Sequence, residues 1–193
     1  MTTSLGDLKR QLDRLWAGID DHCRTCSDRD CIGAIPVLPD EEEAVLDAGV
    51  ETVQMNGEHG PIFLNSYRRT AAGLALEKNA CPYRDLVSGQ CRIHRSRPLA
   101  CHMYPLALEA QPDGTIAWVL HRDCAYVRAA EQGGGIDSLL DRIRRWIAGV
   151  APAVRERLIE NERKVAAITA WPDGPNRLFI VEVVDSVAPS SSA

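Results

Sequence analysis

The chain has 193 residues and a formal net charge of −5 at pH 7, with 45% hydrophobic and 25% charged residues. This length allows one domain with an appended lobe, and the composition is typical of a soluble globular protein. The acidic balance argues against a nucleic-acid binder that works through bulk positive charge.

The N-terminal segment predicts a helix. Apolar residues recur at helical spacing from Leu5 to Ile19, so we expect a helix that ends near Asp20. Charged residues interrupt the segment every few positions, and it lacks the apolar stretch of a signal peptide. No run in the chain approaches the ~18 apolar residues of a membrane span. We therefore expect a cytoplasmic protein without a membrane partner.

The next segments predict a loop and then a short helix. "DHCRTCSDRDC" is polar and has no period, as expected of a loop that wraps round a metal. "PDEEEAVLDAG" predicts a helix that begins at Pro39 and Asp40 and ends at Gly49. We expect its three glutamates, at positions 41–43, to serve the helix N-terminus and solvent. Residues 50–80 are compatible with short strands or with a helix.

The remainder of the chain predicts a hairpin, two helices and a strand. "LALEAQPDGTIAWVL" places a Pro-Asp-Gly turn between two apolar runs, which indicates a β-hairpin that leads to Cys124. Gly133–Gly135 interrupt the chain. Apolar residues at helical spacing then predict helices over 136–150 and 154–168, separated by Ala151-Pro152. "RLFIVEVV" predicts a late strand, and the tail "APSSSA" is expected to be disordered.

Seven cysteines are the strongest chemical signal. In a reducing cytosol such a density indicates metal binding or catalysis, and an odd number cannot pair completely in disulfides. A two-residue gap, as in "CRTC", lets two sulfurs face one ion from a tight turn. Cys81, Cys91 and Cys101 stand ten positions apart, and all seven cysteines precede Gly133. We predict that the metal ligands are Cys23, Cys26, Cys31, Cys81, Cys91, Cys101 and Cys124.

Basic residues are concentrated around two of these cysteines in "CRIHRSRPLACHMYP", although the chain as a whole is acidic. Guanidinium groups near thiols lower the thiol pKa and stabilise the metal-bound thiolate, and hydrogen bonds to cluster sulfurs tune the redox potential. For each arginine the alternative is an ordinary exposed residue. A histidine beside a cysteine often orients a ligand without binding the metal. The predicted orienting residues are Arg92, Arg97, His102 and Tyr104.

"CPYRDLVSGQCRIHRSRPLACHMYP" resembles the second half of the YkgJ-type cysteine-cluster family, a zinc- or iron-chelating domain. The matching positions are Cys81, Pro82, Cys91, Ile93, Arg97, Pro98, Cys101, Tyr104 and Pro105. The upstream "CRTCSDRDC" resembles a variant of the family's first cluster, so the resemblance covers residues 23–124. Ile32 follows Cys31 where the family has a second cysteine, and His94 and His102 replace a common Tyr and Arg. A histidine is therefore a candidate substitute ligand.

The resemblance implies zinc or an iron–sulfur cluster. Zinc bound by four cysteines, or by three and a histidine, would be a structural staple. A 4Fe-4S cluster would imply redox chemistry or substrate activation, and seven thiols exceed what one closed zinc site needs. The flagellin lysine N-methylases among the relatives are iron–sulfur proteins, so the resemblance also implies an oxidoreductase or an S-adenosylmethionine-dependent methyltransferase. The sequence does not identify a catalytic residue.

Taken together, the sequence predicts an α+β fold. A small cysteine-rich metal-binding domain with short strands and a β-hairpin takes up residues 1–132. A C-terminal helical extension follows over 133–185, and a disordered tail over 186–193. The favoured function is an iron–sulfur protein that acts on a small-molecule or protein substrate, without nucleic acid. The alternative is a zinc-stapled module whose C-terminal helices bind a partner, and the oligomeric state stays open.

Overall fold

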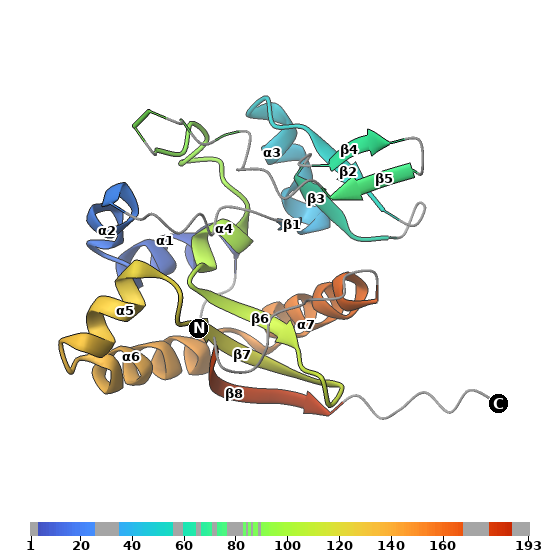
Figure 1. Ribbon diagram of the computed structural model, residues 1–193. Helices are drawn as coiled ribbons and strands as arrows, with labels where there is room; N and C mark the ends of the chain where they lie inside the picture. The colour runs from blue at the N-terminus through green and yellow to red at the C-terminus, as the bar shows by residue number, and fades with distance from the viewer. Residues whose placement is uncertain are drawn as a thin grey trace. The chain divides into compact units, whose positions relative to one another are not determined.

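The computed structural model describes residues 4–25, 35–55, 60–64, 67–70, 73–76, 83, 85, 87–88, 90–167 and 178–186 (Figure 1). Helices and small antiparallel sheets alternate along the chain, which confirms the predicted α+β class. The chain divides into two compact units. One spans residues 18–102, and the other joins residues 1–17 to residues 103–193.

A three-stranded antiparallel sheet organises the discontinuous unit. Its order is β6-β7-β8, with β6 at Leu106–Ala110, β7 at Thr115–His121 and β8 at Leu178–Ser186. The predicted hairpin is confirmed, since β6 and β7 pair in register from Leu106 opposite Leu120 to Ala110 opposite Ile116. Asp113 closes the turn by accepting hydrogen bonds from the Thr115 amide and hydroxyl, at 2.9 and 2.7 Å. The predicted late strand is β8.

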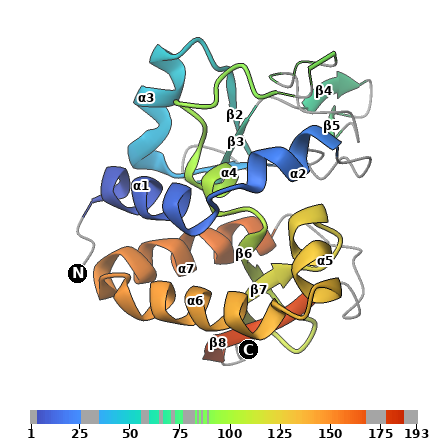
Figure 2. The same ribbon diagram turned by 90° about the vertical axis from the view of Figure 1, so that its left-hand side faces the viewer.

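Helices complete the described part of this unit, and Figure 2 gives a second view of them. They are α1 (Leu5–Leu15), α5 (Ala125–Gln132), α6 (Ile136–Gly149) and α7 (Pro152–Ala166), so both predicted C-terminal helices are confirmed. Trp118 of β7 is fully buried and meets Trp146 of α6 edge to face, with 5.8 Å between ring centroids. The N-terminal part joins through a hydrogen bond from the Arg142 guanidinium to the Leu15 carbonyl. Trp16 also meets Tyr126 edge to face.

The first helix is shorter than predicted. Helix α1 ends at Leu15, and Gly18 adopts a φ of +86°, a conformation that interrupts a right-handed helix. A second helix, α2, then runs over Ile19–Thr25 with two aspartates in its first turn, where negative charge is favourable. The predicted loop from Asp21 is therefore wrong over the residues that α2 contains.

Short strands and helices make up the unit 18–102. One sheet has the order β1-β3-β2, and a second consists of β4 and β5. Residues 50–80, which the sequence left open, therefore contain strands. The predicted helix after Pro39 is confirmed, with a 3₁₀ turn, η1, before α3. The elements are β1 (Pro36–Val37), η1 (Pro39–Glu41), α3 (Glu42–Asp47), β2 (Thr52–Gln54), β3 (Ile62–Leu64), β4 (Tyr67–Thr70) and β5 (Gly73–Leu76), followed by α4 (Leu99–Met103).

A cluster of aliphatic residues forms the core of this unit. Its buried members are Val37, Val45, Val50, Ile62 and Leu64. Tyr83 and Ile93 pack against them. These two residues belong to the cysteine-rich segment, so the apolar core fixes that segment on either side of Cys91.

Glu41 has a role that the sequence did not predict. Its side chain is buried, and its Oε1 accepts a hydrogen bond of 2.7 Å from the Leu99 amide, 58 residues further along the chain. The expectation that all three glutamates serve their own helix and solvent is therefore wrong for Glu41. Glu42 is also engaged, since the Thr52 hydroxyl donates to it at 3.0 Å.

The predicted domain boundaries remain predictions. Gly133 separates α5 from α6 within one compact unit, and that unit also includes residues 1–17. The predicted tail lies outside the described residues beyond Ser186. No helix in the described ranges is both long and apolar enough to span a membrane.

Replacement of Glu41 by Ala should lower the free energy of unfolding by about 1–3 kcal/mol, because the buried Leu99 amide loses its acceptor. Glu41→Gln keeps an acceptor oxygen and should cost less. Chemical denaturation measures both values. Glu43→Ala, at an exposed position of α3, is the control and should change stability by less than about 0.5 kcal/mol. Equal losses for Glu41→Ala and Glu43→Ala would contradict this role.

Candidate metal centre

The structure describes four of the seven predicted metal ligands. Cys23 lies on α2 and is exposed, while Cys91 and Cys101 are half-buried, Cys101 on α4. All three belong to the unit 18–102. Cys124 is buried immediately before α5 in the other unit. Cys26, Cys31 and Cys81 lie outside the described residues.

The segment from Cys91 to Cys101 is a succession of tight turns that leads into α4. The His94 amide donates to the Cys91 carbonyl at 3.3 Å, and the Ser96 amide donates to the Ile93 carbonyl at 2.8 Å. The Cys101 amide then donates to the Pro98 carbonyl at 3.0 Å. Cys101 therefore stands in the first turn of α4, whose start the buried Glu41 carboxylate fixes.

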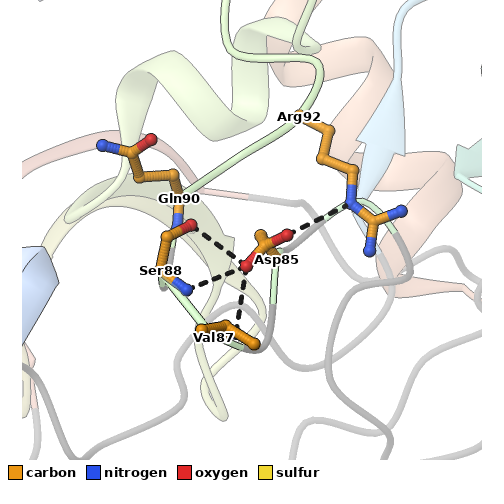
Figure 3. A network of polar contacts seen from close by, with 5 residues as sticks. All are labelled: Asp85, Val87, Ser88, Gln90 and Arg92. Atoms are coloured by element: carbon orange, nitrogen blue, oxygen red, sulfur yellow. Dashed lines mark hydrogen bonds and ion pairs between the residues drawn. The ribbon is translucent and has the colours of Figure 1, made fainter.

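The described residues between Tyr83 and Arg92 belong to a loop whose two ends are joined by backbone hydrogen bonds, and Figure 3 draws five of these residues. The Arg92 amide donates to the Tyr83 carbonyl and the Asp85 amide to the Gln90 carbonyl, each at 2.8 Å. These two bonds are nested as in a hairpin, so the chain on the two sides of the loop is held together. Val87, at the tip, is almost fully exposed.

Asp85 stabilises this loop from within. Its Oδ1 accepts hydrogen bonds from the amides of Val87 and Ser88, at 3.0 and 2.8 Å, and from the Ser88 hydroxyl at 3.1 Å. Arg92 Nε lies 4.0 Å from the other carboxylate oxygen (Figure 3). The Ser88 amide, followed by the Val87 amide, lowers the pKa of Asp85. Its stabilising contribution is therefore present above the unfolded-state pKa and is lost as pH falls through the lower, folded-state pKa.

Tyr83 attaches the loop to the rest of the unit. Its ring packs against the aliphatic core, and its hydroxyl accepts a hydrogen bond of 2.7 Å from the Glu51 amide. The Tyr83 carbonyl also accepts the hydrogen bond from the Arg92 amide. Thus one residue connects the core, the residue before β2 and the loop before Cys91.

Arg97, a predicted orienting residue, contacts a histidine. Its Nη1 lies 3.0 Å from Nε2 of His94. A guanidinium has only donors, so Nε2 accepts and the imidazole proton resides on Nδ1. Nε2 also lies 3.9 Å from an Asp20 oxygen, and an ion pair there requires a protonated Nε2. The contact with Arg97 is the shorter of the two.

The other predicted orienting residues are divided between the two units. Arg92 has a mostly exposed side chain beside Asp85, and His102 is buried on α4 next to Cys101. Tyr104 belongs to the discontinuous unit, where its ring lies 5.6 Å from that of His121. The structure thus groups Arg92, Arg97 and His102 in the unit with Cys91 and Cys101, and Tyr104 in the unit with Cys124.

The donor chemistry of the unit 18–102 fits a thiophilic metal. Six of the seven cysteines fall within this range of the sequence, and thiolates with imidazole are ligands for zinc and for iron–sulfur clusters. Within the described ranges, no three His, Cys, Asp or Glu side chains come together as a metal-binding group. The described cysteines alone therefore do not constitute the site, and the roles of the individual predicted residues remain predictions.

These features define a metal-chelating protein of the cysteine-cluster class. Residues 22–125 match the family model CxxCxxCC, described as "putative zinc- or iron-chelating domain". The match covers more than half of the chain, so the chain belongs to this family, and the resemblance read from the sequence is confirmed. No curated protein and no solved structure shows a significant match.

Sequence reasoning missed the residues that support the cysteines. "DLVS" contained a local signal for Asp85, because an aspartate commonly accepts amides two and three residues further on. Glu41 and the Tyr83 hydroxyl act on residues 58 and 32 positions away, and no spacing rule reaches that far.

Replacement of Asp85 by Ala should open the loop before Cys91 and weaken metal retention about tenfold, as loss of a supporting contact typically does. Amide hydrogen exchange at Val87 and Ser88 measures the opening, and competition with a chelator measures metal retention. Asp85→Asn keeps one acceptor oxygen, so its amide exchange and its metal retention should lie between those of Asp85→Ala and those of the natural chain. Unchanged exchange in Asp85→Ala would show that the loop does not depend on this carboxylate.

Proposed function

We propose that this chain binds a 4Fe-4S cluster through cysteines of residues 18–102 and uses it in redox chemistry or substrate activation. The observation that carries the proposal is the concentration of six cysteines in one compact unit of a zinc- or iron-chelating family member. A closed zinc site needs four ligands, so six thiols exceed one such site. A cluster bound by four cysteines leaves two for a further role.

The described structure supports a preformed site. The loop before Cys91 is closed by its own backbone, filled by Asp85 and anchored by Tyr83. Cys101 follows on a helix whose start is held by Glu41. When backbone is ordered before the metal arrives, less conformational entropy is lost on binding. These two cysteines are therefore the best-positioned ligands among the described residues.

Arg97 supplies positive charge to the same unit. Its Nη1 lies 3.0 Å from His94 Nε2, and a guanidinium group is a permanent cation with only hydrogen-bond donors. Bound, an iron–sulfur cluster would supply electron transfer or an iron for an anionic ligand. Arg97 would then hold such a ligand or orient the cluster sulfurs, because its planar group donates in a fixed geometry. We expect a small-molecule or protein substrate, without nucleic acid.

Zinc is the second candidate, because the family description names zinc together with iron. Zinc would staple the short strands and loops of the unit 18–102, and partner binding would then be the function. Anaerobic purification followed by iron, acid-labile sulfide and zinc analysis distinguishes the two metals. We expect a brown protein with iron and sulfide. A colourless protein with stoichiometric zinc would overturn the iron–sulfur assignment.

Replacement of Cys91 or Cys101 by Ser should remove most of the metal, because a hydroxyl is a poor ligand for a thiophilic centre. Metal analysis of the purified variants measures the loss. Ser96→Ala, which removes a hydroxyl between the two cysteines, is the matched control and should keep its metal. Full metal content in both cysteine variants would exclude these residues as ligands.

Replacement of Arg97 by Lys should leave the metal content nearly unchanged but shift the redox potential. Lys keeps the charge and loses the planar, multiply donating group. If Arg97 acts through His94, then His94→Ala should cause a similar shift, and the double variant should add little to either change. Wild-type potential, metal content and melting temperature in Arg97→Lys would show that Arg97 has no such role.

A further inference from the structure

Strand β6 lies at one edge of the sheet, because the strand order is β6-β7-β8. Its hydrogen bonds to β7 alternate. The Gln111 amide donates to the Thr115 carbonyl at 2.7 Å, and the His121 amide donates to the Pro105 carbonyl at 2.9 Å. The backbone polar groups that point towards β7 are therefore those of Gln111, Glu109 and every second residue back to Pro105. The amide of the intervening Ala110 points away from β7. An outward amide at a sheet edge needs another acceptor.

Helix α7 supplies that acceptor. Oε1 of Glu162 lies 3.0 Å from the Ala110 amide nitrogen and accepts its hydrogen bond. Glu162 is 7% exposed and shares the buried side of α7 with Val154, Leu158 and Val165. A carboxyl group thus occupies a position in an otherwise apolar stripe, where ionisation is costly.

The charges round Glu162 do not compensate a carboxylate. On β6 the nearest charged group is Glu109, which repels a second negative charge and is itself bound to His121 at 2.8 Å. Arg155 of α7 pairs with Glu182 of β8 at 3.0 Å, and Lys164 lies near Glu160. Within the described residues no cation pairs with Glu162. Burial, opposed by the Ala110 hydrogen bond and assisted by Glu109, raises the pKa of Glu162 to about 8.

We propose that docking of α7 on the edge of β6 takes up one proton, at the carboxyl group of Glu162, and that α7 opens more readily as pH rises. In the docked state the protonated, neutral Glu162 side chain accepts a hydrogen bond from the Ala110 amide and places no charge in the apolar stripe. In the open state water solvates the carboxylate and the proton leaves. Opening uncovers the outward amide of β6, so the same residue controls access to this sheet edge.

The pH range follows from proton linkage. Glu162 ordinarily titrates near 4.5 and here near 8, so the docked state binds the extra proton between these values. The stability from docking is complete below the lower value and is lost as pH rises towards the higher one. One proton corresponds to about a tenfold change in the opening equilibrium for each pH unit, from about pH 5 to about pH 8. Above that range the dependence should level off.

Amide hydrogen exchange of the whole chain over this pH range tests the proposal. After correction for intrinsic exchange, protection of α7 and of the Ala110 amide should fall about tenfold per pH unit. Glu162→Gln keeps an acceptor oxygen but cannot ionise, so its protection should not follow this titration. Glu156→Gln, at an exposed position of α7, is the matched control and should behave as the natural chain does.

A direct titration guards against a variant that fails to fold. Carboxyl ¹³C resonances of the natural chain should include one Glu, assigned to position 162, that titrates near pH 8. A Glu162 carboxyl that titrates near its ordinary value would overturn the proposal. So would a Glu162→Gln protein whose α7 protection keeps the pH dependence of the natural chain.

Discussion

The hydrogen bond between the Glu41 carboxylate and the Leu99 amide is the constraint on which the cysteine-rich unit depends. It joins the turn before α3 to the start of α4, and Cys101 stands two residues beyond the bonded amide. Because the carboxylate is buried, it cannot exchange this partner for water without rearrangement of the unit. The position of one predicted ligand is thus set by a residue from a remote part of the chain.

The loop before Cys91 is ordered by a different means. The Asp85 carboxylate accepts hydrogen bonds from the amides of Val87 and Ser88. Tyr83 connects the loop to the aliphatic core and to the Glu51 amide. Neither arrangement uses a cysteine side chain. The backbone that presents the thiols is therefore held by ordinary hydrogen bonds and apolar packing, and metal binding adds to a structure that already has its own contacts.

Local patterns predicted the local structure well. The Pro-Asp-Gly turn, the apolar stripes of α6 and α7 and the apolar run of β8 each depend on neighbours within a few residues, and each forms as expected. The end of α1 was missed because Gly18 interrupts an apolar period that continues through Ile19. Glu41 and Glu162 could not be predicted, because their partners lie 58 and 52 residues away and helix propensity alone places both among exposed glutamates. The family was evident from Cys81, Arg97-Pro98 and Cys101, whereas the grouping of cysteines into units required the fold.

The discontinuous unit has a consequence for the order of events during synthesis. Helix α1 packs with elements made much later, through the Arg142 contact with Leu15 and the rings of Trp16 and Tyr126. Residues 18–102 leave the ribosome before α6 exists. The cysteine-rich unit can therefore fold, and acquire its metal, before the elements that pack with α1 have been synthesised. An early helix without its packing partner exposes Leu8 and Leu12, both fully buried in the finished chain, so the nascent protein passes through a stage with an uncovered apolar face.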